Sequence, residues 1–337
     1  MGYRVVVTGA AGNMGREVLK LLAERDFPAD EVAALGSARM AGKEISFGEE
    51  TILKLQDVAR FDFRGWDVCF LTPGAGISPD TLRQAAAQGC VVIDVGGQLS
   101  GEAGVPVVVP EVNANSLAKI GAVNMVSNPG AATIPLVMAL KPLHDVVPIR
   151  RVVLATYQSV SGAGKEAMDE LYTQTRAHYV FDPIKPDVLP RQIAFNLFPQ
   201  TSGLLEDGSA EEERALIEET RKIIGAPIQI AVTCVRVPVF IGYALAVHVE
   251  FEQPMEARAA REILEEAPGI VVLDRRREEE YMTPIETAGE DMVYVSRIRK
   301  DPSVPHGIGL WIVTDNMRKG SALNAVQIAE VLAAEHL

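Results

Sequence analysis

The stretch Tyr3-Arg-Val-Val-Val-Thr-Gly-Ala-Ala-Gly-Asn-Met-Gly15 opens the chain and decides its fold. A run of valines ends at a glycine, and Glu17–Glu24 then repeats apolar residues at helical spacing, which predicts a strand, a turn and a helix. Gly9, Gly12 and Gly15 fill the turn. Because glycines carry no side chains, the backbone there can approach a pyrophosphate at the helix N-terminus, so the stretch predicts a dinucleotide site. The alternative is a tight turn that binds nothing.

The rest of the chain continues the alternation of strands and helices. Short apolar runs alternate with helical stretches such as Thr81–Gly89 up to about residue 130, which is typical of a doubly wound parallel sheet. These runs are Val32–Leu35, Val68–Leu71, Val91–Val95 and Val107–Val109. Beyond residue 130 the strands are longer and more alternating, which indicates a mixed or antiparallel second sheet. They are Arg151–Tyr157, Gln229–Val237, Ala244–Phe251 and Val293–Ile298. Ala322–Ala334 predicts a final amphipathic helix.

Composition excludes several classes of protein. The 337 residues carry 32 basic and 45 acidic side chains, and the resulting charge of -13 disfavours binding to nucleic acids and anionic membranes. The three cysteines are widely spaced in apolar runs, so we expect neither disulfides nor a metal site. We find no basic-apolar leader and no apolar run of the ~20 residues that a membrane span needs, so we expect a cytoplasmic protein. The acidic stretch Glu206–Glu219 is expected to be a solvated face.

The end of the second predicted strand bears on the choice of cofactor. NAD sites usually place an acidic residue there for the ribose hydroxyls, about twenty residues beyond the glycines. In this chain Leu35 is followed by Gly-Ser-Ala, with a hydroxyl at Ser37, and then by the guanidinium of Arg39. These two groups suit a 2′-phosphate, so the sequence favours NADP(H). The alternative is that Arg39 and Lys43 form a solvated loop.

Several segments, taken in order, resemble the bacterial aspartate-semialdehyde dehydrogenase family over almost the whole chain. The segments are Thr8–Gly15, Val109–Asn113, Thr156–Lys165, Thr233–Pro238 and Asp315–Gly320. The resemblance implies an α/β fold with an N-terminal Rossmann doubly wound domain at 1–130 and an α+β second domain with a mixed sheet at 131–315. The second domain would carry the reaction and a homodimer interface, and residues 316–337 would return to the Rossmann domain.

The resemblance also implies site residues. Those expected to bind the cofactor are Gly9, Ala11, Gly12, Asn13, Met14, Gly15, Ser37, Arg39, Ser161, Gly162 and Asn316. Gln158, Glu212 and Arg236 match the positions that orient the family's substrate, a small carboxylate. A structural salt bridge at Arg236 and a buried hydrogen bond at Gln158 are the alternatives.

Two positions differ from the family at residues that take part in its reaction. The family forms a thioester on a cysteine in a pattern close to N-P-N-C-[ST]-T, where this chain has Asn128-Pro-Gly-Ala-Ala-Thr133. The methyl group of Ala131 has no lone pair and cannot be that nucleophile. The family's acid-base histidine is replaced by Tyr243, which can donate a proton or merely fill the histidine's space.

Other positions weaken recognition of an acyl phosphate. Ser100 stands where the family has an arginine on the phosphate side, and Ala215 stands where it has a lysine. Arg214 or Arg191 would compensate only in part. Rescue of the nucleophile by Cys234 is disfavoured, because a reactive thiol needs exposure and an electropositive neighbour.

Three functions compete. In the first, this NADP(H)-binding homologue transfers hydride without a thioester to a small carboxylate-bearing carbonyl or imine, with Tyr243 and Gln158 at the reaction centre. In the second, it is a non-catalytic paralogue with a regulatory or subunit-pairing role. In the third, it is a genuine aspartate-semialdehyde dehydrogenase of amino-acid biosynthesis.

Overall fold

The computed structural model describes residues 2–49, 51–74, 76–274 and 280–335. The chain divides into two compact units: unit 1 comprises Met1–Pro129 and Ser321–Leu337, and unit 2 comprises Gly130–Gly320. Within the described ranges, no helix is long and apolar enough to cross a membrane.

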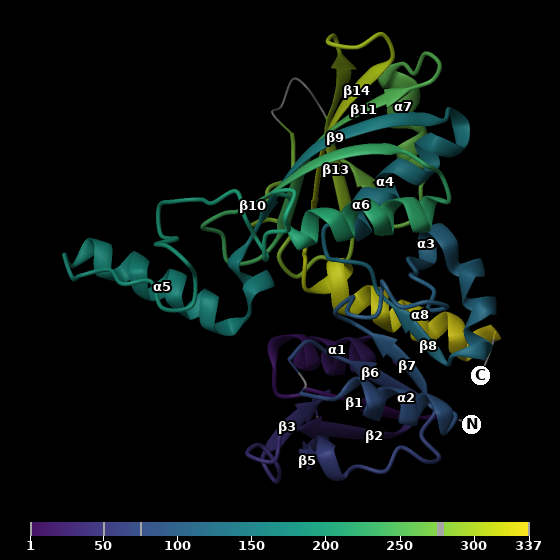
Figure 1. Cartoon of the computed structure of the whole chain (residues 1–337), viewed down its shortest axis with the longest axis vertical. Helices are drawn as coiled ribbons and strands as arrows, with labels where there is room; N and C mark the ends of the chain where they lie inside the picture. Colours follow the sequence, from purple (N-terminus) through teal and green to yellow (C-terminus); the bar gives the residue numbers. More distant parts are fainter. Residues whose placement is uncertain (1, 50, 75, 275–279, 336–337) are drawn as a thin grey trace. The chain divides into compact units, whose positions relative to one another are not determined.

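Unit 1 is built on a six-stranded sheet with the order β5-β2-β1-β6-β7-β8, in which every pair of neighbours is parallel (Figure 1). Its strands are β1 (Tyr3–Val7), β2 (Ala29–Gly36), β5 (Gln56–Asp57), β6 (Val68–Leu71), β7 (Val91–Asp94) and β8 (Met125–Ser127). A small hairpin, β3 (Glu44–Phe47) with β4 (Thr51–Lys54), follows β2. Its helices are α1 (Asn13–Glu24), α2 (Pro79–Ala87), α3 (Pro110–Asn113) and α8 (Leu323–Glu335).

Both faces of the unit 1 sheet are covered, as the valine run at the start of the chain requires. Val5 and Val7 pack with apolar residues of α1 and α8. Val6 points the other way and packs with Leu82, Ala85 and Ala86 of α2. Because successive side chains of a strand alternate between faces, a continuous apolar run suits a sheet with helices on both sides. The predicted Rossmann domain is confirmed.

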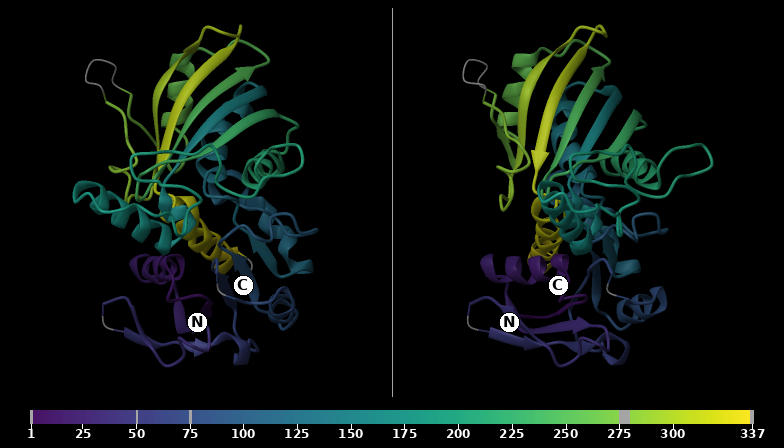
Figure 2. Two further views of the ribbon diagram at one scale, coloured as in Figure 1. Left: turned by 60° about the vertical axis from the view of Figure 1, so that its left-hand side comes forward. Right: turned by 90° about the vertical axis from the view of Figure 1, so that its left-hand side faces the viewer.

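Unit 2 contains a mixed six-stranded sheet with the order β10-β9-β11-β14-β13-β12 (Figure 2). The β9–β10 and β12–β13 pairs are parallel and the other neighbours are antiparallel. The strands are β9 (Ile149–Gln158), β10 (Gln229–Arg236), β11 (Tyr243–Phe251), β12 (Ile270–Val272), β13 (Val293–Asp301) and β14 (Gly307–Thr314). The predicted mixed sheet is therefore confirmed.

Helices α4 (Thr133–Val146), α6 (Glu211–Ile224) and α7 (Ala257–Glu265) pack against the unit 2 sheet. Helix α5 (Lys165–Tyr179) extends away from this sheet (Figure 1). It follows a short helical turn, Val160–Ala163, which begins directly after β9. The end of β9 thus leads straight into the segment that contains Ser161 and Gly162.

Two local predictions are wrong. The run Val107–Val109 forms only an isolated bridge, between Val107 and Ser127, because α3 begins at Pro110 directly after it. The acidic stretch Glu206–Glu219 is not a wholly solvated face, since it contains the start of the amphipathic helix α6. Glu219 lies on the buried side of that helix and is only 5% exposed.

Candidate functional site

The glycine turn of unit 1 has the form that a dinucleotide requires. Gly9 has a positive φ of 58°, and Gly12 precedes α1 as its N-cap without a side-chain cap. A Cβ on Gly15 would lie 2.4 Å from the carbonyl oxygen of Gly9 and 2.6 Å from the Cα of Ala10. The turn therefore closes tightly on the helix N-terminus, the end that favours a negative charge. The residues present fit a pyrophosphate at this turn.

The loop after β2 offers a separate cation. Ser37 and Arg39 are both exposed just beyond Gly36, the last residue of that strand. Within the part of the chain that the structure describes, the guanidinium of Arg39 has no hydrogen bond or ion pair. A cation that the fold leaves uncompensated beside the end of β2 suits a phosphate on the adenosine ribose.

Four polar side chains of unit 2 stand in one row across neighbouring strands. Gln158, the last residue of β9, is opposite both Arg236 of β10 and Tyr243 of β11. Tyr243 is in turn opposite Thr314 at the end of β14. All four residues are buried. The sheet register thus brings together three predicted site residues that are far apart in the sequence: Gln158, Arg236 and Tyr243.

Within this row, the carboxamide of Gln158 meets a carboxylate, that of Glu212. Nε2 of Gln158 donates to Oε1 of Glu212 at 2.8 Å and to Oγ1 of Thr156 at 3.1 Å. The other carboxylate oxygen of Glu212 accepts from the hydroxyl of Thr201 at 2.5 Å. Oε1 of Gln158 is buried and has no hydrogen-bond partner among the described residues. An orphaned buried acceptor is costly, so this atom fits a hydrogen-bond donor supplied by a ligand.

Arg236 and Tyr243 flank Gln158 in the row. Nη1 of Arg236 donates to the carbonyl oxygen of Ser159 at 2.7 Å and lies 3.5 Å from the hydroxyl of Tyr243. That hydroxyl also lies against the backbone of Gly162, where a Cβ would come within 1.9 Å of it. Burial raises the pKa of Tyr243 to about 12, despite the opposing effect of the nearby Arg236. The phenol therefore stays protonated at neutral pH and can donate a proton or hydrogen bond.

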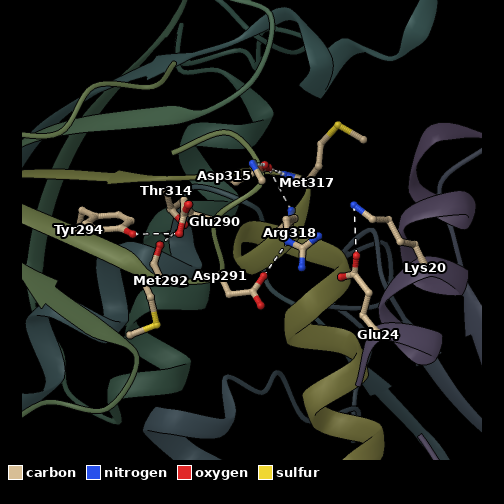
Figure 3. Close-up of polar contacts among 11 residues, drawn as sticks. Lys20, Glu24, Glu290, Asp291, Met292, Tyr294, Thr314, Asp315, Met317 and Arg318 are labelled. Carbon is tan, nitrogen blue, oxygen red and sulfur yellow. Dashed lines mark hydrogen bonds and ion pairs between the residues drawn. The ribbon is translucent and has the colours of Figure 1, made fainter. Parts of the chain in front are cut away.

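Asn316 organises the backbone next to Tyr243. Its Oδ1 accepts from the backbone N–H of Gly242 at 2.9 Å, and its Nδ2 donates to the hydroxyl of Ser161 at 3.0 Å. The residues after it are fixed by a separate network. Asp315 accepts from the backbone N–H groups of Met317 and Arg318, and Arg318 pairs with Asp291 at 2.6 Å (Figure 3). Ser161, Gly162 and Asn316, predicted to bind the cofactor, thus lie in unit 2 beside the polar row.

Ala131 lies in the turn that leads into α4, and a carboxylate missed by the sequence interpretation holds this turn. Oε2 of Glu219 accepts from the backbone N–H of Gly130 and from the hydroxyl of Thr133, both at 2.8 Å. Gly320 borders the same turn, where a Cβ would lie 3.6 Å from the Cβ of Ala131. The acidic run around Glu219 concealed its role, although its apolar neighbour Leu216 marks the buried side of the helix.

The three cysteines of the chain are free and buried. Cys234 is fully buried on β10, and burial raises the pKa of its thiol to about 12. Burial also raises the pKa of Cys69 and Cys90. All three are inert thiols by these criteria. The described residues contain no group of histidine, cysteine and acidic side chains that could hold a metal ion.

The structure shows the surroundings of Arg214 and Arg191, the two cations expected to compensate in part for the absent arginine and lysine. Arg214 pairs with Asp207 at 2.6 Å, and both side chains are about half exposed. Arg191 is exposed. A surface ion pair of this kind contributes little to the stability of the fold.

The raised pKa of Tyr243 predicts a pH dependence of stability. A tyrosine titrates near ~10 when unfolded, and the pKa of Tyr243 in the fold is about 12. The neutral phenol therefore stabilises the fold below pH ~10, and this contribution is lost as the pH rises towards the folded pKa. The free energy of unfolding in urea, relative to that of Tyr243→Phe, is expected to fall by about 1–2 kcal/mol between pH 9.5 and 11.5. The exposed Tyr179→Phe is the control, and a pH-independent difference for Tyr243→Phe would contradict the prediction.

The fold and the site define a two-domain NAD(P)-binding protein, with a glycine turn in one unit and a polar row in the other. Residues 4–120 match the family described as "Semialdehyde dehydrogenase, NAD binding domain", and residues 140–319 match "Semialdehyde dehydrogenase, dimerisation domain". An aspartate-semialdehyde dehydrogenase of Rickettsia bellii is 45% identical over 99% of both chains. One of Aquifex aeolicus is 42% identical over the whole of both chains. The chain belongs to the aspartate-semialdehyde dehydrogenase family.

A solved structure supports the same assignment. Aspartate semialdehyde dehydrogenase II from Vibrio cholerae superposes with a TM-score of 0.96 at 40% identity, and the match covers the whole of both chains. The names of these relatives support the third of the competing functions, the genuine dehydrogenase, better than the altered chemistry or the non-catalytic paralogue. The residues at positions 131 and 243 are the observations that point away from the family reaction.

Proposed function

We propose that this chain is a divergent member of its family that uses NADPH to reduce a small carboxylate-bearing carbonyl compound, of the semialdehyde class, without a thioester. The observation that carries the proposal is that Arg236, Gln158 and Tyr243 are buried side by side in one row, in a chain that has alanine at position 131. The family name supports the substrate class. Because position 131 has no nucleophile, the hydride would pass directly to the carbonyl compound, without a covalent intermediate.

Arg236, Gln158 and Tyr243 each have a role in this chemistry. Arg236 would pair with the substrate carboxylate, and Oε1 of Gln158 would accept a hydrogen bond from a substrate N–H or O–H group. Tyr243 would give its proton to the carbonyl oxygen as the carbon–oxygen π bond opens, and solvent would then reprotonate it. The nearby guanidinium of Arg236 would stabilise the charge that develops on that oxygen. When bound, NADPH supplies the hydride that the carbonyl carbon accepts, so the product is an alcohol.

For the cofactor, the proposal specifies NADP(H) rather than NAD(H). The exposed guanidinium of Arg39 is the group expected to pair with the 2′-phosphate. Arg39→Ala is expected to raise the Kd for NADPH about tenfold to a hundredfold and to leave the Kd for NADH nearly unchanged, as calorimetry would show. Lys43→Ala is the matched control on the same loop. An equal loss for both cofactors would assign Arg39 a structural role instead.

The proposal also includes a cytoplasmic homodimer or higher homo-oligomer, supported by the match of residues 140–319 to a dimerisation domain. Light scattering of the purified chain measures its oligomeric state directly. A monomer at micromolar concentration would remove this part of the proposal.

The reaction is tested by following NADPH absorbance with a panel of small oxo acids and semialdehydes, aspartate semialdehyde among them. The expected result is phosphate-independent oxidation of NADPH with at least one compound. Arg236→Lys should raise KM, while Tyr243→Phe should lower kcat about tenfold or more. Tight NADPH binding without turnover of any compound would contradict the proposed reductase activity and favour the non-catalytic paralogue.

The second candidate is the family reaction itself, which the names of the relatives favour. It would place the chain in amino-acid biosynthesis. The signature of the family reaction is a phosphate-dependent reduction of NADP by aspartate semialdehyde. That activity would have to survive the replacement of all three cysteines, because the buried thiols would take no part in it.

A further inference from the structure

A short segment of unit 2, residues 198–203, connects two members of the candidate site. Its first residue, Phe198, is paired with Arg236 at the end of β10. The backbone N–H of Phe198 donates to the carbonyl oxygen of Arg236 at 3.1 Å, and the reverse bond measures 2.9 Å. A few residues further on, the segment bonds to Glu212 in the first turn of α6. We call residues 198–203 the linking segment.

The linking segment holds the N-terminus of α6. The N-cap of this helix is Ala210, whose methyl group cannot accept a hydrogen bond. The backbone N–H of Glu211 donates to the carbonyl oxygen of Gly203 at 2.9 Å. The backbone N–H of Glu212 donates to the hydroxyl of Ser202, also at 2.9 Å. Because the first N–H groups of a helix need acceptors from outside the helix, the linking segment fixes the backbone at Glu212.

Thr201, also in the linking segment, fixes the side chain of the same glutamate. The hydroxyl of Thr201 donates to Oε2 of Glu212 at 2.5 Å, while Nε2 of Gln158 donates to Oε1 at 2.8 Å. A carboxylate with a donor on each oxygen cannot rotate without losing at least one of these charge-assisted bonds. The carboxylate of Glu212 is therefore held where one of its oxygens meets the amide of Gln158.

The orientation of the Gln158 amide follows from the position of this carboxylate. Its nitrogen has two acceptors, Glu212 and Thr156, and its buried Oε1 is left without a partner among the described residues. If Glu212 turned away, the amide could rotate by half a turn and direct its NH₂ group to the place that Oε1 now occupies. The amide thus offers a ligand an acceptor only while Glu212 is held in place.

We propose that Thr201 is a positioning residue that sets the preference of the polar row for carboxylates with an O–H or N–H group near the carboxylate. It acts through Glu212 and Gln158 and touches no ligand itself. The inference rests on the proposed binding of a small carboxylate at this row, but not on the transfer of hydride. Its main test is therefore a binding measurement with saturated acids in the NADPH complex, because such acids have no ketone or aldehyde group to reduce.

L-Malate, L-aspartate and succinate are the probes, since they differ only in a hydroxyl, an ammonium group or a hydrogen on one carbon, and calorimetry measures their Kd values. The unmodified chain is expected to bind malate or aspartate at least about tenfold more tightly than succinate. Thr201→Val has nearly the same shape but no hydroxyl, and it should reduce this preference about tenfold while the Kd of succinate hardly changes. Thr201→Ser should restore the preference. With a compound that the chain reduces, Thr201→Val should raise KM and leave kcat nearly unchanged.

Thr220→Val is the matched control, because Thr220 is a buried threonine of α6 whose hydroxyl has no hydrogen-bond partner among the described residues. It should leave the preference unchanged. Equal affinities of the unmodified chain for the three acids, or no binding of any of them, would overturn the proposal. So would a preference that Thr201→Val retains or that Thr201→Ser fails to restore. A preference that depends on Thr201, without oxidation of NADPH by any carbonyl compound, would support this role and contradict only the reductase.

Discussion

The double variant Ala131→Cys/Tyr243→His is expected to reduce NADP with aspartate semialdehyde and phosphate at least about 100-fold faster than the unmodified chain. Cysteine supplies the lone pair that the methyl group of Ala131 lacks. The pKa of Tyr243 is about 12, so the phenol cannot serve as the accompanying base near neutral pH, whereas histidine titrates near ~6.5. The initial rate is measured as the increase in the absorbance of NADPH at 340 nm.

Local packing should accept both substitutions. Gly320 places no side chain beside Ala131, and imidazole is shorter than the phenol whose hydroxyl now lies against Gly162. Ala131→Cys alone should react with iodoacetamide but give little turnover, which separates the nucleophile from the base. Ser100 and Ala215 remain in the double variant, so its KM for phosphate is expected to stay high. Equal phosphate-dependent rates for the unmodified chain and the double variant would show that position 131 does not limit the reaction.

The Rossmann unit could be predicted from the sequence because its signals are local. The valine run, the three glycines and the following helical spacing all lie within 24 residues, and each has a direct physical meaning. The same holds for Arg39, whose place at the end of β2 follows from counting along one strand and its loop.

The polar row could be predicted only through the family resemblance, since strand register is a long-range property. Gln158 and Tyr243 are partners because β9 and β11 pair in one particular alignment, and a shift of one residue would turn every side chain to the other face. Strand β14 was missed because Gly307 and Gly309 weaken its strand pattern. Gly309 is in fact the residue that accommodates the guanidinium of Arg299.

Glu219 shows a different limit of sequence reasoning. It stands in a run of acidic residues that is typical of a solvated helix face, yet it is buried and holds the turn before α4. Its two partners, Gly130 and Thr133, are more than eighty residues away in the sequence. Only the packing of α6 against α4 reveals that one carboxylate of the run serves the turn at position 131.

Gly15→Ala is expected to have the largest effect on unit 1, lowering its stability by about 1–3 kcal/mol and the affinity for NADPH at least about tenfold. The new methyl group would lie 2.4 Å from the carbonyl oxygen of Gly9 and 2.6 Å from the Cα of Ala10. Both are backbone atoms, so a side-chain rotation cannot relieve the contact and the whole turn must move away from α1. Calorimetry with NADPH and thermal unfolding measure the two effects.

Gly12→Ala is the matched control for this turn. Gly12 has a φ of -74°, which alanine adopts freely, and a Cβ there would meet only the carbonyl oxygen of Gly9, at 3.3 Å. Its cost in stability should therefore be clearly smaller than that of Gly15→Ala. If Gly12→Ala weakens NADPH binding while the melting temperature hardly changes, the methyl group obstructs the pyrophosphate rather than the fold. If Gly15→Ala leaves both stability and NADPH binding unchanged, the close approach of the turn to α1 is not what holds the dinucleotide.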